Sequence, residues 1–117
     1  MRYSKQILAL SLLLTATLFL TACPQRTTIG QINADPSRYQ NKEVGVAGRV
    51  TDSYGFMGMG IYEIDDGTGH LIVVTHRGVP SRGSRVAAKG HIQTGFSFGG
   101  RSFGTVLEET DRRAEGR

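Results

Sequence analysis

The sequence predicts an all-β domain, a closed barrel of five short strands with a short N-terminal helical turn, behind a signal peptide. Five segments either alternate apolar and polar residues or form short apolar runs, and turn residues separate them. All 16 glycines lie in the mature part of the chain, which disfavours long helices there. A closed barrel is the expected arrangement of such strands because closure removes exposed strand edges.

Residues 1–22 have the order of a secretory signal. Arg2 and Lys5 precede an uncharged apolar run at 7–20, and the small residues Thr21 and Ala22 follow it. The run is too short to span a bilayer comfortably as a mature helix. An exported protein is therefore expected.

The end of this segment, "LTAC" at 20–23, resembles the lipobox of bacterial lipoproteins. The resemblance implies cleavage before Cys23, which would then carry diacylglyceryl and a further acyl group such as palmitate; an ordinary signal with a chance cysteine is the alternative. More than one acyl chain gives stable membrane anchoring. Cys23 is the single cysteine, and Pro24 replaces the Asp that favours inner-membrane retention in that family. We therefore expect the periplasmic face of the outer membrane.

The mature part divides into a lipidated tether at 23–28, one domain at 29–109 and a disordered charged tail at 110–117. Without Arg2 and Lys5 it keeps 12 of the 14 basic residues against 10 acidic ones. Such a small excess of positive charge does not by itself predict a nucleic-acid binder.

The first expected elements are a helical turn at 35–39 and a strand at 43–52. Asp35 suits an N-cap and Pro36 the first helical position, and Tyr39 is expected to face the core. Strict alternation in the strand predicts that one face carries Val44, Val46, Gly48 and Val50.

The segment "IYEIDDGTGHLIVV" at 61–74 predicts two strands joined by an Asp- and Gly-rich knot. Asp66-Gly67 favours a two-residue turn that pairs Glu63 with His70. A calcium loop would need more oxygen ligands and a later bidentate Glu, and a phosphate loop would need a Lys and a following helix. The knot is therefore interpreted as a turn. Its register predicts that the inner face holds Tyr62, Ile64, Leu71 and Val73.

Strands at 84–94 and 101–109 complete the set. The first alternates, with Val86, Ala88, Gly90 and Ile92 on one face. A turn at Gly99-Gly100 would pair Phe96 with Phe103 and Ile92 with Leu107.

The run "YEIDDGTGHLIVV" followed by "GVPSRGSRVAAKGHI" resembles the second to fourth strands of OB-folds. The resemblance covers about residues 29–109 and is to exported bacterial OB-fold domains related to the anticodon-binding and single-strand-binding group. It implies a five-stranded Greek-key barrel. "THRGVPSRGS" is too short and too rich in Gly and Pro for the helix that often joins strands 3 and 4, so the turn at 35–39 is expected to plug a barrel end.

OB-folds bind oligomeric ligands on the outer face of strands 2 and 3 and on two flanking loops. Here those loops are expected at 53–60 and 94–102. The candidate ligand-binding residues are Tyr54, Phe56, His70, Ile72, Val74, His76, Arg77 and Arg101. The aromatic residues could stack on bases or sugars. The alternation favours a core position for Phe96 and Phe98 and leaves both interpretations open for Tyr54 and Phe56.

The remaining polar residues are interpreted as solvent-exposed. Six basic residues could follow an anionic polymer along one groove, although a solvated face is favoured: Arg49, Arg77, Arg82, Arg85, Lys89 and Arg101. His70, His76 and His91 lack the spacing of a metal site. Neither a catalytic motif nor a cofactor motif is recognised.

These observations favour a non-enzymatic OB module that is anchored to the membrane and binds a protein or an envelope component. The alternative is a protein that binds single-stranded nucleic acid. The aromatic loops support that alternative, and the expected compartment opposes it.

Overall fold

The computed structural model describes residues 26–115, and of Phe98 only the backbone. The expected signal peptide, Cys23, the start of the tether and the last two residues of the tail lie outside this part. Within residues 26–115, neither helix has the length and apolar character needed to cross a bilayer.

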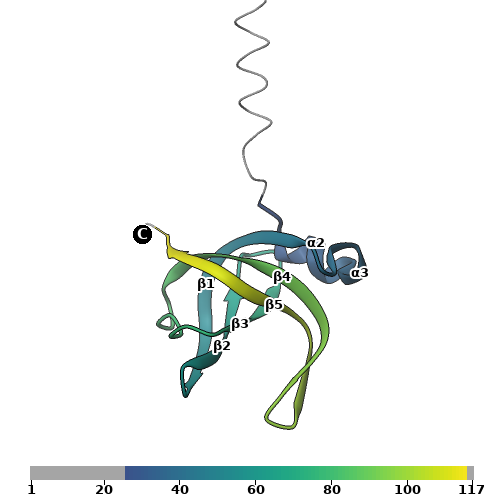
Figure 1. The fold of residues 1–117 in the computed structure, drawn as a ribbon. Coiled ribbons are helices and arrows are strands. Elements are labelled where there is room, and N and C mark those ends of the chain that lie inside the picture. Colours follow the sequence, from purple (N-terminus) through teal and green to yellow (C-terminus); the bar gives the residue numbers. More distant parts are fainter. Residues whose placement is uncertain (1–25, 116–117) are drawn as a thin grey trace, which may run out of the picture.

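Five strands close into a barrel in the order β1-β2-β3-β5-β4, with β4 paired back to β1 (Figure 1). The predicted five-stranded barrel is confirmed. The three strands β1, β2 and β3 form an antiparallel meander, and β5 lies between β4 and β3, parallel to β3. The bounds are β1 Glu43–Phe56, β2 Met59–Asp65, β3 His70–Thr75, β4 Arg85–Phe98 and β5 Arg101–Ala114.

The barrel interior is filled by the apolar residues that alternation placed on one face of each strand. Tyr62, Ile64, Leu71 and Val73 are all buried in one core with the inward residues of β1 and β4. Opposite Ile92, Leu107 of β5 is fully buried, and this predicted pair is confirmed. The period of two therefore assigned the inner faces correctly.

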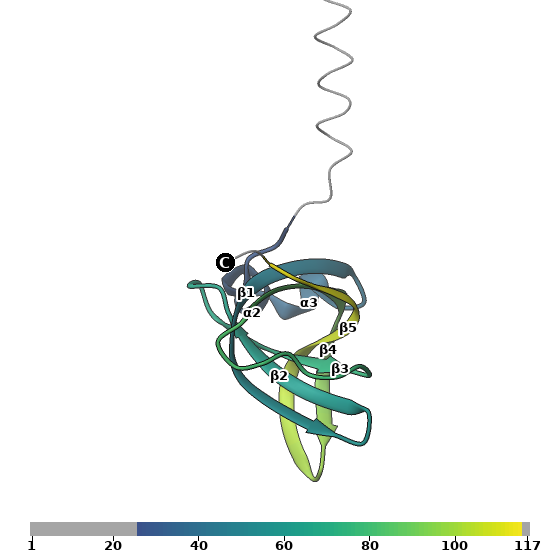
Figure 2. The same cartoon turned by 90° about the vertical axis from the view of Figure 1, so that its left-hand side faces the viewer.

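Two short helices close one end of the barrel (Figure 2). The helix α3, Pro36–Tyr39, is the predicted helical turn, and Tyr39 packs against the core as expected. The other helix, α2, Ile29–Ala34, was not predicted. Ile29 and Ile32 are fully buried in the barrel core, so α2 supplies most of the plug that was expected from the turn alone.

The knot is a turn, but a longer one than predicted. Asp65 pairs with His70 and Glu63 with Ile72, so the predicted pairing of Glu63 with His70 is wrong by two positions. A shift of two residues preserves the alternation, which explains why the predicted faces survive the wrong register. The four-residue loop at 66–69 forms because Asp65 and Asp66 accept hydrogen bonds from the amides of Gly67 and Thr68, each at 2.8 Å.

Two hairpins extend well beyond the barrel and occupy segments that were expected to be loops. The strand β1 continues to Phe56, with Met57 and Gly58 at positive φ in the turn. The turn at Gly99-Gly100 is confirmed. Phe96 pairs with Gly104 instead of Phe103, because the register shifts there.

The expectation of a disordered tail from residue 110 is also wrong as far as residue 114. The strand β5 runs to Ala114 and pairs with β4 as far as Val86. The strand β4 has backbone N–H and C=O groups along this whole length, and pairing with β5 satisfies their hydrogen bonds.

A second, smaller apolar cluster lies outside the barrel core, where the β4–β5 hairpin meets β2 and β3. Ile61, Val74 and Val106 are buried there, with Phe96 and Phe103 packed against them. The two phenylalanine rings contact each other with centroids 6.3 Å apart. Phe96 therefore packs as expected, but in this outer cluster and not in the barrel interior.

Candidate functional site

The outer face of the barrel carries a small cleft between its two long hairpins. It has a volume of about 210 Å³ and its walls come from β1, β2, β3 and the start of β5. This position is the one that the sequence predicted for ligand binding. The lining residues are Asp52, Tyr54, Ile61, Tyr62, Glu63, Ile72, Arg101 and Phe103.

One wall of the cleft is apolar and belongs to the outer cluster. Ile72 of β3 and Phe103 of β5 are half-buried there, and both pack against the buried residues of that cluster. The guanidinium of Arg101 lies over the ring of Phe103, 5.7 Å from its centroid. An apolar surface beside the positioned guanidinium of Arg101 can contact a flat or aliphatic group of a ligand.

The charged residues of the cleft include more acids than bases. Asp52 is ion-paired with Arg82 of the β3–β4 loop, and Glu63 accepts a hydrogen bond from the Thr51 hydroxyl at 2.8 Å. Arg101 is the cation among the lining residues. With Asp52 balanced by Arg82, Glu63 and Arg101 leave the cleft without an excess of positive charge, so it is poorly suited to a polyphosphate backbone.

The tip of the β1–β2 hairpin, defined here as Tyr54, Phe56 and Met57, exposes large apolar side chains. Their exposed fractions are 63%, 65% and 87%. Since Tyr54 also lines the cleft, the tip and the cleft form one continuous surface. Exposed aromatic and methionine side chains on a protruding hairpin are typical of an interaction surface.

The structure brings Tyr54, Ile72 and Arg101 together in the cleft, with Phe56 at the adjoining tip. Val74 is 3% exposed beneath the outer cluster, so it is a packing residue there and has little surface to offer a ligand. His70 lies near the cleft, with Nδ1 3.4 Å from the carboxylate of Glu63.

His76 and Arg77 follow the end of β3 and do not line the cleft. The guanidinium of Arg77 is ion-paired with Asp111 of β5 at 3.4 Å.

The other basic residues do not form a single groove. Lys89 is ion-paired with Glu43, and Arg49 lies opposite Arg85 across β1 and β4. Those two arginines share a separate hollow with Asp65 and Asp66. No group of three or more potential metal-ligating side chains occurs within residues 26–115.

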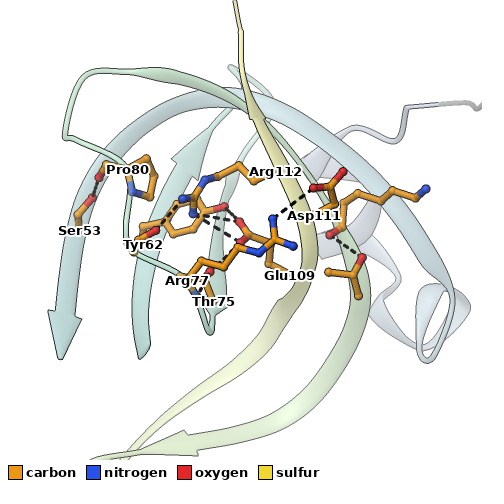
Figure 3. A network of polar contacts seen from close by, with 11 residues as sticks. Ser53, Tyr62, Thr75, Arg77, Pro80, Glu109, Asp111 and Arg112 are labelled. Atoms are coloured by element: carbon orange, nitrogen blue, oxygen red, sulfur yellow. Dashed lines mark hydrogen bonds and ion pairs between the residues drawn. The ribbon is translucent and has the colours of Figure 1, made fainter. Parts of the chain in front are cut away.

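A buried polar network joins β2, β3 and β5 on the inner side of the sheet (Figure 3). Glu109 lies at its centre. It accepts hydrogen bonds from the hydroxyl of Tyr62 and, at 2.7 Å, from that of Thr75. Arg112 approaches the same carboxylate at 3.2 Å and donates to the carbonyl of Gly78 at 2.6 Å.

This network ties the β3–β4 loop to β5. Burial, together with the hydrogen bond to Glu109 and its charge, raises the pKa of Tyr62 far above its ordinary value. Glu109 is 8% exposed and Tyr62 1%, so a ligand has little access to either group. We interpret the network as structural.

The sequence missed Phe103, Asp52 and Glu63 as parts of the cleft. Phe103 was predicted to pair with Phe96, but Gly104, at positive φ, takes that place in the register, although the two rings still contact each other. A glycine inside a strand is the available signal for such a bulge.

No family model matches this chain, and no curated protein matches it either. Several solved structures are similar to it. The chain is similar to asparaginyl-tRNA synthetase from Pyrococcus horikoshii, with 17% identity and a TM-score of 0.61 over 79% of this chain and 23% of that one. It thus spans about a quarter of that synthetase.

Two further structures cover the domain by itself or in a complex. OBody AM3L09, solved bound to hen egg-white lysozyme, has 21% identity and a TM-score of 0.59 over 79% of this chain and 96% of that chain. A chain of the Stn1–Ten1 complex of S. pombe has 17% identity and a TM-score of 0.51 over 62% of this chain and 57% of that chain. At these identities the likeness shows the fold alone, and the fold is an OB-fold.

Proposed function

We propose that this protein is a membrane-anchored bacterial lipoprotein whose OB domain is a non-enzymatic binding module for a protein partner in the cell envelope. The "LTAC" segment with its preceding signal supports the anchor. The observation that carries the binding function is the exposed apolar hairpin tip, Tyr54, Phe56 and Met57, beside a cleft with two carboxylates.

The chemistry of this surface favours a protein over a nucleic acid. Aromatic and methionine side chains are enriched where proteins meet, and each adds apolar area that leaves water on binding. The cleft has no excess positive charge to attract a phosphate backbone, because Arg82 balances Asp52, whereas Glu63 suits a basic side chain of a polypeptide. The OBody structure supports the proposal in one respect, because that neighbour is bound to a protein, lysozyme.

Single-stranded nucleic acid is the second candidate. Tyr54 and Phe103 offer rings for base stacking, and Arg101 offers one phosphate contact. The similarity to asparaginyl-tRNA synthetase supports this candidate at the level of the fold.

An amide NMR titration of residues 24–117 with a short single-stranded DNA, at low and moderate salt, separates the two candidates. We expect no shifts in the cleft. Shifts at residues 52–63, 70–72 and 101–103 that fade as salt rises would overturn the protein-binding proposal, because phosphate contacts weaken steeply with salt.

The protein partner is tested by capture from envelope extracts. We expect the intact protein to retain a specific polypeptide at moderate salt, and a Tyr54→Ala, Phe56→Ala double variant to lose it. Arg38→Ala, an exposed change on α3, is the matched control and should retain the partner. Equal capture by both variants would show that the hairpin tip is not the binding surface.

The anchor has a separate test. The mass of the mature protein purified from bacterial membranes should equal that of residues 23–117 with acyl groups added at Cys23. A mature chain without those groups would refute the lipoprotein assignment.

A further inference from the structure

A second hollow of the described domain lies at the opposite end of the barrel from the hairpin tips. It has a volume of about 550 Å³ and lies between the starts of β1 and β4, the end of β5 and Arg26. Its polar residues include four cations and two carboxylates: Arg26, Lys89, Arg112, Arg113, Glu43 and Asp111. Part of its wall is formed by the small residues Gly45 and Ala87, which leave space above the strands.

The chain is fixed to the barrel at the rim of this hollow. Arg26 forms a bridge with Gly45 of β1, and the amide of Thr27 donates to the carbonyl of Gly45 at 2.9 Å. The guanidinium of Arg26 also pairs with Glu115 at 2.6 Å. Residues 26 and 27 therefore belong to the folded domain, and no flexible linker separates them from it.

Only Pro24 and Gln25 stand between Arg26 and Cys23. Three fully extended residue steps span about 10 Å at most. If the acyl chains are on Cys23, as proposed above, Arg26 is held close to the membrane surface, and the hollow beside it is within reach of the headgroups. A lipoprotein with a long tether would have no such constraint.

We propose that this hollow is a docking surface for anionic phospholipid headgroups and that it fixes the orientation of the domain on the membrane. This inference rests on the proposed lipid anchor. Arg113 is exposed and forms no ion pair with any residue of 26–115, so it is free to meet a phosphate. Basic residues next to a membrane anchor add to its hold on anionic bilayers.

The orientation has a functional consequence. The start of β1 and the end of β5 lie at one end of the molecule in Figure 1, and both hairpin tips lie at the other. With the hollow against the headgroups, the cleft and the apolar tip point away from the bilayer. A soluble or membrane-bound partner could then reach them.

The test uses the purified, acylated protein in nanodiscs of phosphatidylethanolamine, with or without phosphatidylglycerol. Hydrogen exchange is followed at residues 43–47, 86–89 and 111–114. We expect slower exchange in these segments when phosphatidylglycerol is present. Arg113→Glu should lower that protection roughly fivefold or more, from the effect of one basic residue near an anionic surface.

The matched control is Arg101→Glu, which makes the same change of charge at the far hairpin tip and should leave the lipid-dependent protection intact. Equal exchange in both kinds of nanodisc, with Cys23 shown by mass to be acylated, would overturn the docking surface and leave the anchor standing. Loss of protection in both variants alike would show only a general charge effect and would also overturn it. A protein that proves not to be acylated would overturn both proposals.

Discussion

At the scale of single residues, Asp66 shows how a turn can also hold a helix. One carboxylate oxygen accepts from the amide of Ile29 at 2.9 Å, and the other accepts from Thr68. The hydroxyl of Thr68 in turn accepts from the amide of Gly30 at 2.8 Å. The knot thereby satisfies two first-turn amides of α2 that the helix cannot satisfy by itself.

We predict that Asp66→Asn destabilises the domain by about 1 kcal/mol at neutral pH, the usual cost of a weakened cap. Burial raises the pKa of Asp66, but the hydrogen bonds from Ile29 and Thr68 outweigh it and hold this pKa below its ordinary value. A lowered pKa gives stability that is complete above the pKa of the unfolded chain and is lost as the pH falls through the folded value.

The difference between the native protein and Asp66→Asn should therefore shrink as the solution is acidified below the ordinary pKa of an aspartate. Urea unfolding at a series of pH values measures it. A difference that stays constant down to strongly acidic pH would mean that the charge of Asp66 contributes nothing.

Glu109 also joins separate elements, since its carboxylate contacts Tyr62 of β2, Thr75 of β3 and Arg112 of β5. Its side chain is 1% exposed and faces Arg112, which is 18% exposed. We predict that Glu109→Gln costs about 3 kcal/mol, because it leaves the guanidinium without its counter-charge in a largely buried place. Chemical denaturation gives this value directly.

Tyr62→Phe is the matched comparison for Glu109→Gln. It removes one hydroxyl from the same carboxylate, keeps the ring, and should cost about 1.5 kcal/mol. If the two variants are equally stable, the ion pair adds nothing beyond a hydrogen bond.

At the scale of elements, the backbones of β4 and β5 approach each other closely at Gly90. A Cβ atom on Gly90 would lie 2.0 Å from the carbonyl oxygen of Glu108 and 2.7 Å from its carbon. The register of the two strands also shifts between Lys89 and Gly90. A glycine is needed here because any side chain would push the backbones apart.

We predict that Gly90→Ala destabilises the domain by about 1 to 3 kcal/mol through overpacking. Gly45→Ala is the control, since a Cβ there meets nothing within 4 Å, and it should be neutral or stabilising by up to about 1 kcal/mol. Thermal unfolding of both variants compares them. Similar losses in both would point to strand flexibility and not to the contact with Glu108.

At the scale of the whole molecule, the interaction surface and the stabilising core are separate. Tyr54 and Phe56 lie on a hairpin that projects beyond the barrel and are mostly exposed, whereas the core is complete without them. We predict that Tyr54→Ala and Phe56→Ala each change the free energy of unfolding by less than about 0.5 kcal/mol. A large loss of stability on denaturation would make them core residues and would remove the basis for the proposed binding surface.

Much of this fold follows from local sequence pattern. Alternation over 43–52 and 84–94 assigns the inner faces, and Gly99-Gly100 specifies its own turn. Such features depend on neighbours in sequence, so one sequence suffices to predict them. The register at the knot did not follow, because Asp66 and Thr68 bond to a helix 37 and 38 positions away in the chain.

By itself, then, the amino-acid sequence determined a five-stranded barrel, its buried faces and the general position of a cleft on β2 and β3. Only the tertiary structure decided that the β4–β5 hairpin folds over that face, burying Val74 and placing Phe103 and Arg101 at the cleft. It also decided that the basic residues are dispersed among separate partners. The physical reason is that periodicity fixes which way a side chain points, whereas the curvature and register shifts of long strands fix what it meets.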